Sequence, residues 1–94
     1  MHIRFLNDPD TDQPHIYNHG VTELAVIEVL NSSPLTLHAD EGALMALGQT
    51  ASGRYLKIIY RDDLEKDEIF VITAFPLSGK ALKAFRRRRR RRGR

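Results

Sequence analysis

The sequence predicts one α+β domain, in which an antiparallel β-sheet of about four strands is packed by N-terminal helices and a short C-terminal helix. Apolar residues recur at helical spacing between residues 15 and 31, whereas residues 35–76 alternate short strand-forming runs with turn residues. A chain of 94 residues buries only about 65% of its surface on folding, enough for one small core. We therefore expect a single domain over residues 1–85 and a disordered arginine-rich tail over residues 86–94.

The first third of the chain predicts a strand, a loop and a broken helix. Residues 2–6 alternate well enough for a short strand, and residues 7–14 are rich in aspartate and proline, as loops are. Gly20 interrupts the helical pattern, so we expect a short helical turn before it and a helix over residues 22–31. Thr22 is a suitable N-cap, because its side-chain oxygen can accept a hydrogen bond from a free N–H of the first turn.

From residue 35 onward the pattern is that of an antiparallel meander that leads into a helix. Strands are expected at residues 35–38, 43–50, 54–61 and 68–76. Pro76 ends the last strand, because proline has no N–H to donate to a neighbour. Ser78 can then cap a short helix over residues 79–85, which runs into the arginines.

The charge of the chain is divided between its two parts. The 15 lysines and arginines against 12 aspartates and glutamates give a net charge of +3. Eight of the basic residues lie in the last nine positions, so residues 1–85 carry a net charge of −5. Consecutive arginines repel one another and cannot bury apolar area, which favours a tail that is disordered or a frayed extension of the last helix.

A run of arginines is the electrostatic footprint of a polyanion-binding segment. Seven phosphate contacts would give log affinity against log salt a slope of about −5 on a single strand. The candidate nucleic-acid contacts are Lys83, Arg86, Arg87, Arg88, Arg89, Arg90, Arg91 and Arg92. The alternatives are that the tail docks on the acidic domain of its own or a neighbouring molecule, binds an acidic protein, or has no specific partner.

Three short segments carry a resemblance to a known family. They are His19-Gly20-Val21 before a helix that ends in Val29-Leu30, the strand-turn-strand from Ala46 to Leu56, and Ile72-Thr73-Ala74 before a basic helix. Together they resemble the BrnT-type toxins of bacterial toxin–antitoxin systems and related small proteins, within the broad RelE-like fold, over roughly residues 15–85. The resemblance implies helices on an antiparallel sheet, ribonuclease activity without metal or cofactor, and an antitoxin as protein partner.

Other features of the chain depart from the toxin pattern. Where BrnT-type toxins have a basic segment, this chain has Phe75-Pro76-Leu77, and it contains no tryptophan. The acidic balance of residues 1–85 supplies few cations to a substrate. These departures favour binding of RNA, another polyanion or an acidic protein, with a metal-independent endoribonuclease as the alternative.

RNA cleavage without a metal needs a base, a cation for the charged phosphorane and an acid for the leaving oxygen. The catalytic candidates are His19 as base or acid, Arg54 as the phosphate clamp that matches the glycine-arginine pair of the family, and Lys80. Tyr60 and Thr73 are further candidates. Each has a plainer interpretation: His19 caps a helical turn, Arg54 pairs with a nearby carboxylate, Tyr60 and Thr73 are sheet residues, and the lysines lie on the wet face of a helix.

The sequence offers little for other chemistry. His15 and His19 are spaced as a metal pair on a helix, but no HExxH glutamate lies between them, so we expect no metal site. The chain has no cysteine, no phosphate-binding glycine loop and no serine nucleophile elbow. No apolar run is long enough to span a membrane and no secretory segment is visible, so we expect a cytoplasmic protein. A homodimer that forms by pairing of edge strands is a further possibility.

Overall fold

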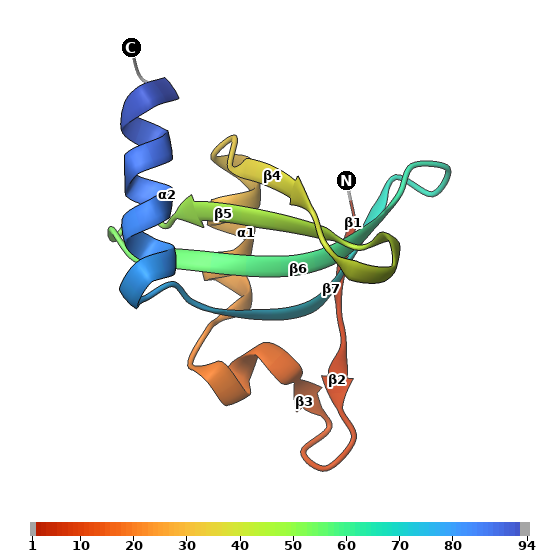
Figure 1. The fold of residues 1–94 in the computed structure, drawn as a ribbon. Coiled ribbons are helices and arrows are strands. Elements are labelled where there is room, and N and C mark those ends of the chain that lie inside the picture. Colours follow the sequence, from red (N-terminus) through yellow and green to blue (C-terminus); the bar gives the residue numbers. More distant parts are fainter. Residues whose placement is uncertain (1, 93–94) are drawn as a thin grey trace.

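The structure, a computed structural model, is an α+β arrangement of one five-stranded mixed sheet, a two-stranded ladder and two α-helices (Figure 1). It describes the backbone of residues 2–92 and the side chains of residues 2–88. The strands of the main sheet, in spatial order, are β1 (His2–Phe5), β7 (Glu68–Pro76), β6 (Tyr55–Asp63), β5 (Leu44–Gln49) and β4 (Leu35–His38).

The four strands β4 to β7 form the antiparallel meander that the sequence predicts. The sheet differs from the expected one at its edge, where β1 pairs with β7 in parallel, with Ile3 opposite Ile69 and Phe5 opposite Val71. In this position Ile3 and Phe5 pack against the core. Burial of these two side chains therefore explains why β1 pairs with the free edge of β7. A pairing between the two ends of a chain leaves no local signal, which is why the sequence predicts the strand but not its place.

The first helical segment is broken at Gly20, as predicted. A 3₁₀ helix, η1, covers His15–His19 and ends at Gly20, whose φ of 70° is the left-handed conformation that glycine adopts readily. Helix α1 covers Glu23–Asn31, and Thr22 is its N-cap, with the hydroxyl accepting from the N–H of Ala25 at 3.1 Å. Both predictions are confirmed. The expected loop before η1 contains a two-stranded ladder, with strands β2 (Asn7–Asp8) and β3 (Gln13–Pro14).

The core lies between one face of the sheet and the elements η1 and α1 (Figure 1). Its fully buried side chains are Ile16, Val21, Val26, Val29, Leu56, Ile58 and Val71. Gly48 lets α1 approach β5 closely, because a Cβ there would lie 2.9 Å from Cγ1 of Val29. A second 3₁₀ helix, η2 (Asp40–Gly42), forms the expected turn between β4 and β5.

Helix α2 lies on the other face of the sheet, at the end where β6 begins (Figure 1). Phe85 is only 5% exposed, and its ring meets Tyr55 edge to face with centroids 5.9 Å apart. The helix covers Gly79–Arg92, so the short helix expected at residues 79–85 is longer than predicted and continues through the arginines. The expected disorder of residues 86–94 stays a prediction, and residues 93–94 lie outside the described residues.

Between residues 2 and 92, no helix combines the length and the apolar character needed to cross a membrane.

Candidate nucleic-acid interface

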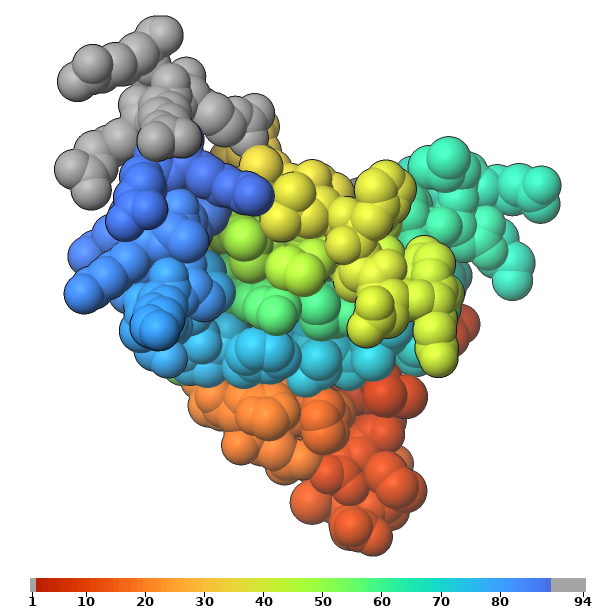
Figure 2. Space-filling view, in the orientation of Figure 1, coloured from red at the N-terminus to blue at the C-terminus, as the bar shows by residue number. Residues whose placement is uncertain are grey.

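The face of the sheet opposite α1, here called the open face, is covered by α2 at one end only. Figure 2 views the molecule from this side, with α2 at one end of the strands and the β6–β7 hairpin at the other. Alternation along the strands directs Leu37, Met45 and Ile59 to this face, and all three are half-buried. The open face is therefore apolar in its middle and accessible to solvent.

Three basic side chains on this side of the molecule lie over aromatic rings. Nζ of Lys57 is 5.4 Å from the ring centroid of Phe75, which is directly opposite it in the β6–β7 register. Two further pairs have the same geometry: Cζ of Arg4 is 5.3 Å from the Phe70 centroid, and Cζ of Arg86 is 5.0 Å from that of Tyr55. The rings fix the positions of these cations on the acidic domain. Sequence reasoning missed Lys57, because only the strand register places it beside Phe75.

The exposed surface of α2 supplies the densest positive charge. Lys80 and Lys83 are exposed in its first turns, and Arg86, Arg87 and Arg88 are exposed in the part that follows. The arginine segment, residues 86–92, is about 10 Å long at the rise of an α-helix. Successive helical residues are turned by about 100°, so the side chains of Arg86, Arg87 and Arg88 point in different directions around the axis. The side chains of Arg89, Arg90, Arg91 and Arg92, also predicted as contacts, lie outside the described residues.

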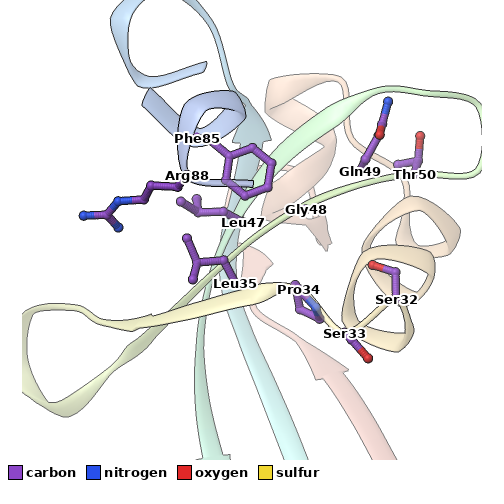
Figure 3. Close-up of a pocket in the computed structure, with 10 residues that line it drawn as sticks. All are labelled: Ser32, Ser33, Pro34, Leu35, Leu47, Gly48, Gln49, Thr50, Phe85 and Arg88. Atoms are coloured by element: carbon purple, nitrogen blue, oxygen red, sulfur yellow. The ribbon is translucent and has the colours of Figure 1, made fainter. Parts of the chain in front are cut away.

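A pocket of about 400 Å³ adjoins the arginine segment. Figure 3 shows Leu35, Leu47 and Phe85 converging in it, with Arg88 extending from the same helix as Phe85. Its other lining residues are Ser32, Ser33, Pro34, Gly48, Gln49 and Thr50. It thus combines an apolar floor with one guanidinium at its rim, which fits a ligand with an apolar body and an anionic group.

One of the three catalytic candidates, Arg54, contacts the backbone next to another, His19. The turn between β5 and β6 holds Arg54 in place, because the N–H of Arg54 donates to Oγ1 of Thr50 at 3.0 Å. From there Nη1 of Arg54 donates to the carbonyl oxygen of Gly20 at 2.8 Å, which puts its guanidinium beside the residue that follows His19. The expected pairing of Arg54 with a carboxylate is therefore absent among the described residues.

The surroundings of His19 are aromatic. Its ring lies edge to face with Phe75, at 5.7 Å between centroids, and with His15 at 5.3 Å. Both His19 and Arg54 are exposed to solvent. Lys80 makes no hydrogen bond, ion pair or ring contact with any described residue, so the structure does not bring it into contact with the other two candidates.

The remaining candidates are placed in the sheet. Tyr60 is 7% exposed and belongs to the core cluster, so the plainer interpretation holds for it. Thr73 lies opposite Ile59, and its hydroxyl oxygen is buried without a hydrogen-bond partner among the described residues. Within the described part of the chain, no three histidines, aspartates or glutamates gather as metal ligands.

Hydrogen bonds near η1 shift two pKa values. The backbone N–H of Asp10 and the amide of Asn18 donate to Asp8 at 2.8 Å and 2.6 Å, and together with nearby His15 they lower the pKa of its carboxyl below 3.8. The hydroxyl of Tyr17 donates to Glu23 at 2.6 Å, which raises the pKa of Tyr17 above 10.0. Each shift reflects a hydrogen bond that stabilises one protonation state of the side chain. These hydrogen bonds therefore stabilise the loop and the start of α1, and they do not activate a catalytic group.

The β6–β7 hairpin is acidic and lies at the far end of the open face. A hollow of about 530 Å³ is lined there by Asp62, Asp63, Glu65 and Glu68, together with Arg61, Leu64 and Phe70. These carboxylates repel a polyanion from this end. The geometry thus favours contact with an anion at α2 and the neighbouring strand ends.

Comparison of the chain with protein-family models, with curated proteins and with solved structures gave no match. The resemblance to BrnT-type toxins therefore depends on the three sequence segments alone.

Proposed function

We propose that this chain is a small RelE/BrnT-like module that binds RNA through α2. The observation that supports this most is the anchoring of the arginine segment. Phe85 and Arg86 both contact Tyr55, so the cationic helix starts from a fixed point on the sheet. An anchored helix loses less conformational entropy on binding than a free tail does, which strengthens the same phosphate contacts.

The charge of the domain restricts where RNA binds. Residues 1–85 carry a net charge of −5, and the acidic hairpin lies at the opposite end of the open face from α2. RNA is therefore confined to α2 and to the strand ends that carry Lys57 and Phe75. Most of the affinity comes from phosphates and is largely independent of base sequence.

A truncation tests this function directly. A chain that ends after Arg86 keeps both contacts with Tyr55 and loses the other arginines, so it should fold and lose most of its affinity for single-stranded RNA in fluorescence anisotropy. Changing Arg87–Arg92 to lysine keeps the charge and should keep most of the affinity. Equal affinity of the truncated and full chains for RNA would refute the proposal, and tighter binding of poly-glutamate than of RNA would favour an acidic protein as the partner.

The second candidate function is the metal-independent endoribonuclease of a toxin–antitoxin system. It is supported by the hydrogen bond from Arg54 to the carbonyl of Gly20, the residue that follows the exposed His19. On this hypothesis His19 moves the 2′-OH proton and Arg54 stabilises the phosphorane. Lys80, the third candidate, would have to reach the substrate from α2, and an antitoxin would cover the site.

Growth and cleavage assays separate the two functions. Expression of a toxin arrests the host, and Arg54→Gln should relieve the arrest and abolish RNA cleavage in vitro. Arg61→Gln is a matched control, because Arg61 also donates from Nη1 to a carbonyl, that of Glu41, at 2.8 Å, but lies far along β6 from His19. If expression is harmless and purified protein leaves RNA intact, the enzyme hypothesis is wrong while RNA binding is unaffected.

A further inference from the structure

The open face is an unpartnered sheet surface with charge of opposite sign at its two ends. At one end α2 presents Lys80, Lys83 and the arginine segment. At the other end the acidic hairpin, residues 62–68, carries five carboxylates against one lysine, and one of the five, Glu68, is paired with Arg4 at 3.3 Å. Asp63 and Glu65 of this hairpin make no ion pair with a described residue, and the register places Asp63 opposite Glu68, on the open side of the sheet. Between the two ends the face is apolar and half-exposed.

The two charged ends of one chain do not meet. The nine residues of β6 span about 30 Å between them. Helix α2 crosses the strands instead of running along them (Figure 1), and its 14 residues extend only about 21 Å. The arginine segment therefore does not reach the acidic hairpin of its own molecule, and the carboxylates of Asp63 and Glu65 remain available to another molecule.

We propose that a second copy of this chain covers the open face. In this dimer the open faces of the two copies face each other, and the twofold axis lies between them, perpendicular to the strands. The α2 end of one sheet therefore lies over the hairpin end of the other. Each arginine segment then lies against the partner's acidic hairpin, and the apolar middles of the two faces come together. Such an interface is isologous, so one favourable charge contact is repeated by symmetry.

The size of the face fits this occupant. Five strands at about 4.8 Å spacing and a nine-residue strand give a sheet face of about 19 by 30 Å. A stable interface buries about 800 Å² per partner, and this sheet face with α2 and the hairpin supplies an area of that order. The interface uses the arginines to which the proposed function assigns RNA, so self-association and RNA binding compete.

Sedimentation velocity of nuclease-treated protein tests the proposal. The full chain is expected as a dimer at low salt and as a monomer at high salt, because the end contacts are ionic. Asp63→Lys with Glu65→Lys reverses two hairpin charges and should weaken dimerisation by about tenfold or more. Asp10→Lys with Glu28→Lys makes the same change in net charge away from the open face and should leave the dimer intact.

Two further variants test the two parts of the interface separately: the apolar contact between the open faces, and the ionic contact between the arginine segment and the acidic hairpin. Leu37→Glu places a charge on the open face at the edge strand and should give a monomer with unchanged circular dichroism. A chain with Arg87, Arg88, Arg90 and Arg91 changed to Glu should be monomeric alone. It should form a heterodimer with the Asp63→Lys, Glu65→Lys chain, because one of the two end contacts is restored.

Some results would overturn the inference whatever the RNA assays give. They are a monomer at low salt after nuclease treatment, a dimer that the hairpin variant leaves unchanged, and the absence of the mixed dimer. A dimer without RNA affinity would contradict the proposed function alone, and RNA affinity in a monomer would contradict this inference alone.

Discussion

At the scale of single residues, Gly48 shows how packing can require glycine at a position where the backbone does not have a positive φ. A Cβ at this position would lie 2.9 Å from Cγ1 of Val29 and 3.3 Å from Cβ of Pro34. Both neighbours belong to the packed junction of α1 and β5, so neither moves freely. The close approach of the helix to the sheet therefore requires glycine here.

We predict that Gly48→Ala lowers the free energy of unfolding by about 1–3 kcal/mol, the usual cost of overpacking a core. Urea denaturation measures the change. The companion variant Val29→Ala, which removes the contacting methyl groups, should reduce the additional cost of Gly48→Ala when the two are combined. A stability equal to that of the unmodified chain would show that α1 does not pack on β5 as described.

Asp8 provides a pH dependence at the same scale. The N–H of Asp10, the amide of Asn18 and His15 favour its ionised form, so the pKa is lower in the folded state than the ordinary 3.8. The stabilisation is present above that value and is lost as the pH falls through the lowered pKa.

We expect the unfolding free energy of the unmodified chain to fall more steeply than that of Asp8→Asn as the pH drops from neutral to below 3.8. Asp10→Asn is the control, because its side chain makes no hydrogen bond with a described residue. Parallel pH curves for the unmodified chain and Asp8→Asn would contradict the assignment.

Residues with local roles are the ones that sequence reasoning predicts. Gly20 and Thr22 act on their own backbone neighbourhood, and their residue types alone indicate a break and a cap. The contact of Arg54 with Gly20 joins residues 34 positions apart, and that of Lys57 with Phe75 depends on the β6–β7 register. No local pattern carries such information, so these contacts appear only in the folded chain.

At the scale of elements, α1 depends on its first turn. Thr22 accepts a hydrogen bond from Ala25, and Glu23 carries a negative charge near the positive end of the helix dipole. The nine-residue helix is too short to be stable alone, so the cap adds to what packing supplies.

Thr22→Ala should therefore cost about 1 kcal/mol of stability, whereas Thr22→Ser, which keeps the hydroxyl, should cost much less. Thermal and urea unfolding of the pair give the comparison. Equal losses for alanine and serine would mean that the methyl group of Thr22 matters rather than the cap.

The elements that the sequence misplaces are those that tertiary packing selects. β1 alternates as a strand should, but only burial of Ile3 and Phe5 against the core decides that it pairs in parallel with β7. Helix α2 is expected over residues 79–85, with the arginines disordered or a frayed extension of it. The helix extends to Arg92, and Phe85 and Arg86 attach it to Tyr55. In both cases a contact distant in the sequence outweighs the local preference.

At the scale of the whole molecule, positive charge gathers at one end of the open face and negative charge at the other. Residues 1–85 have a net charge of −5, and eight further positive charges follow. This polarity was visible in the sequence; the structure adds the direction, since α2 and the acidic hairpin lie at opposite ends of the strands (Figures 1 and 2). It underlies the two proposals made above, RNA binding at α2 and pairing of two copies.

The salt dependence of RNA binding tests this polarity most directly. The affinity of the full chain for a single-stranded RNA, measured by anisotropy over a series of salt concentrations, should give a log–log slope of about −5 if all seven arginines meet phosphates. The chain that ends after Arg86 keeps one of the seven arginines, so it should bind weakly and give a slope of only about −1. An equally steep slope for the truncated chain would contradict the account, because it would place the polyanion on the acidic domain.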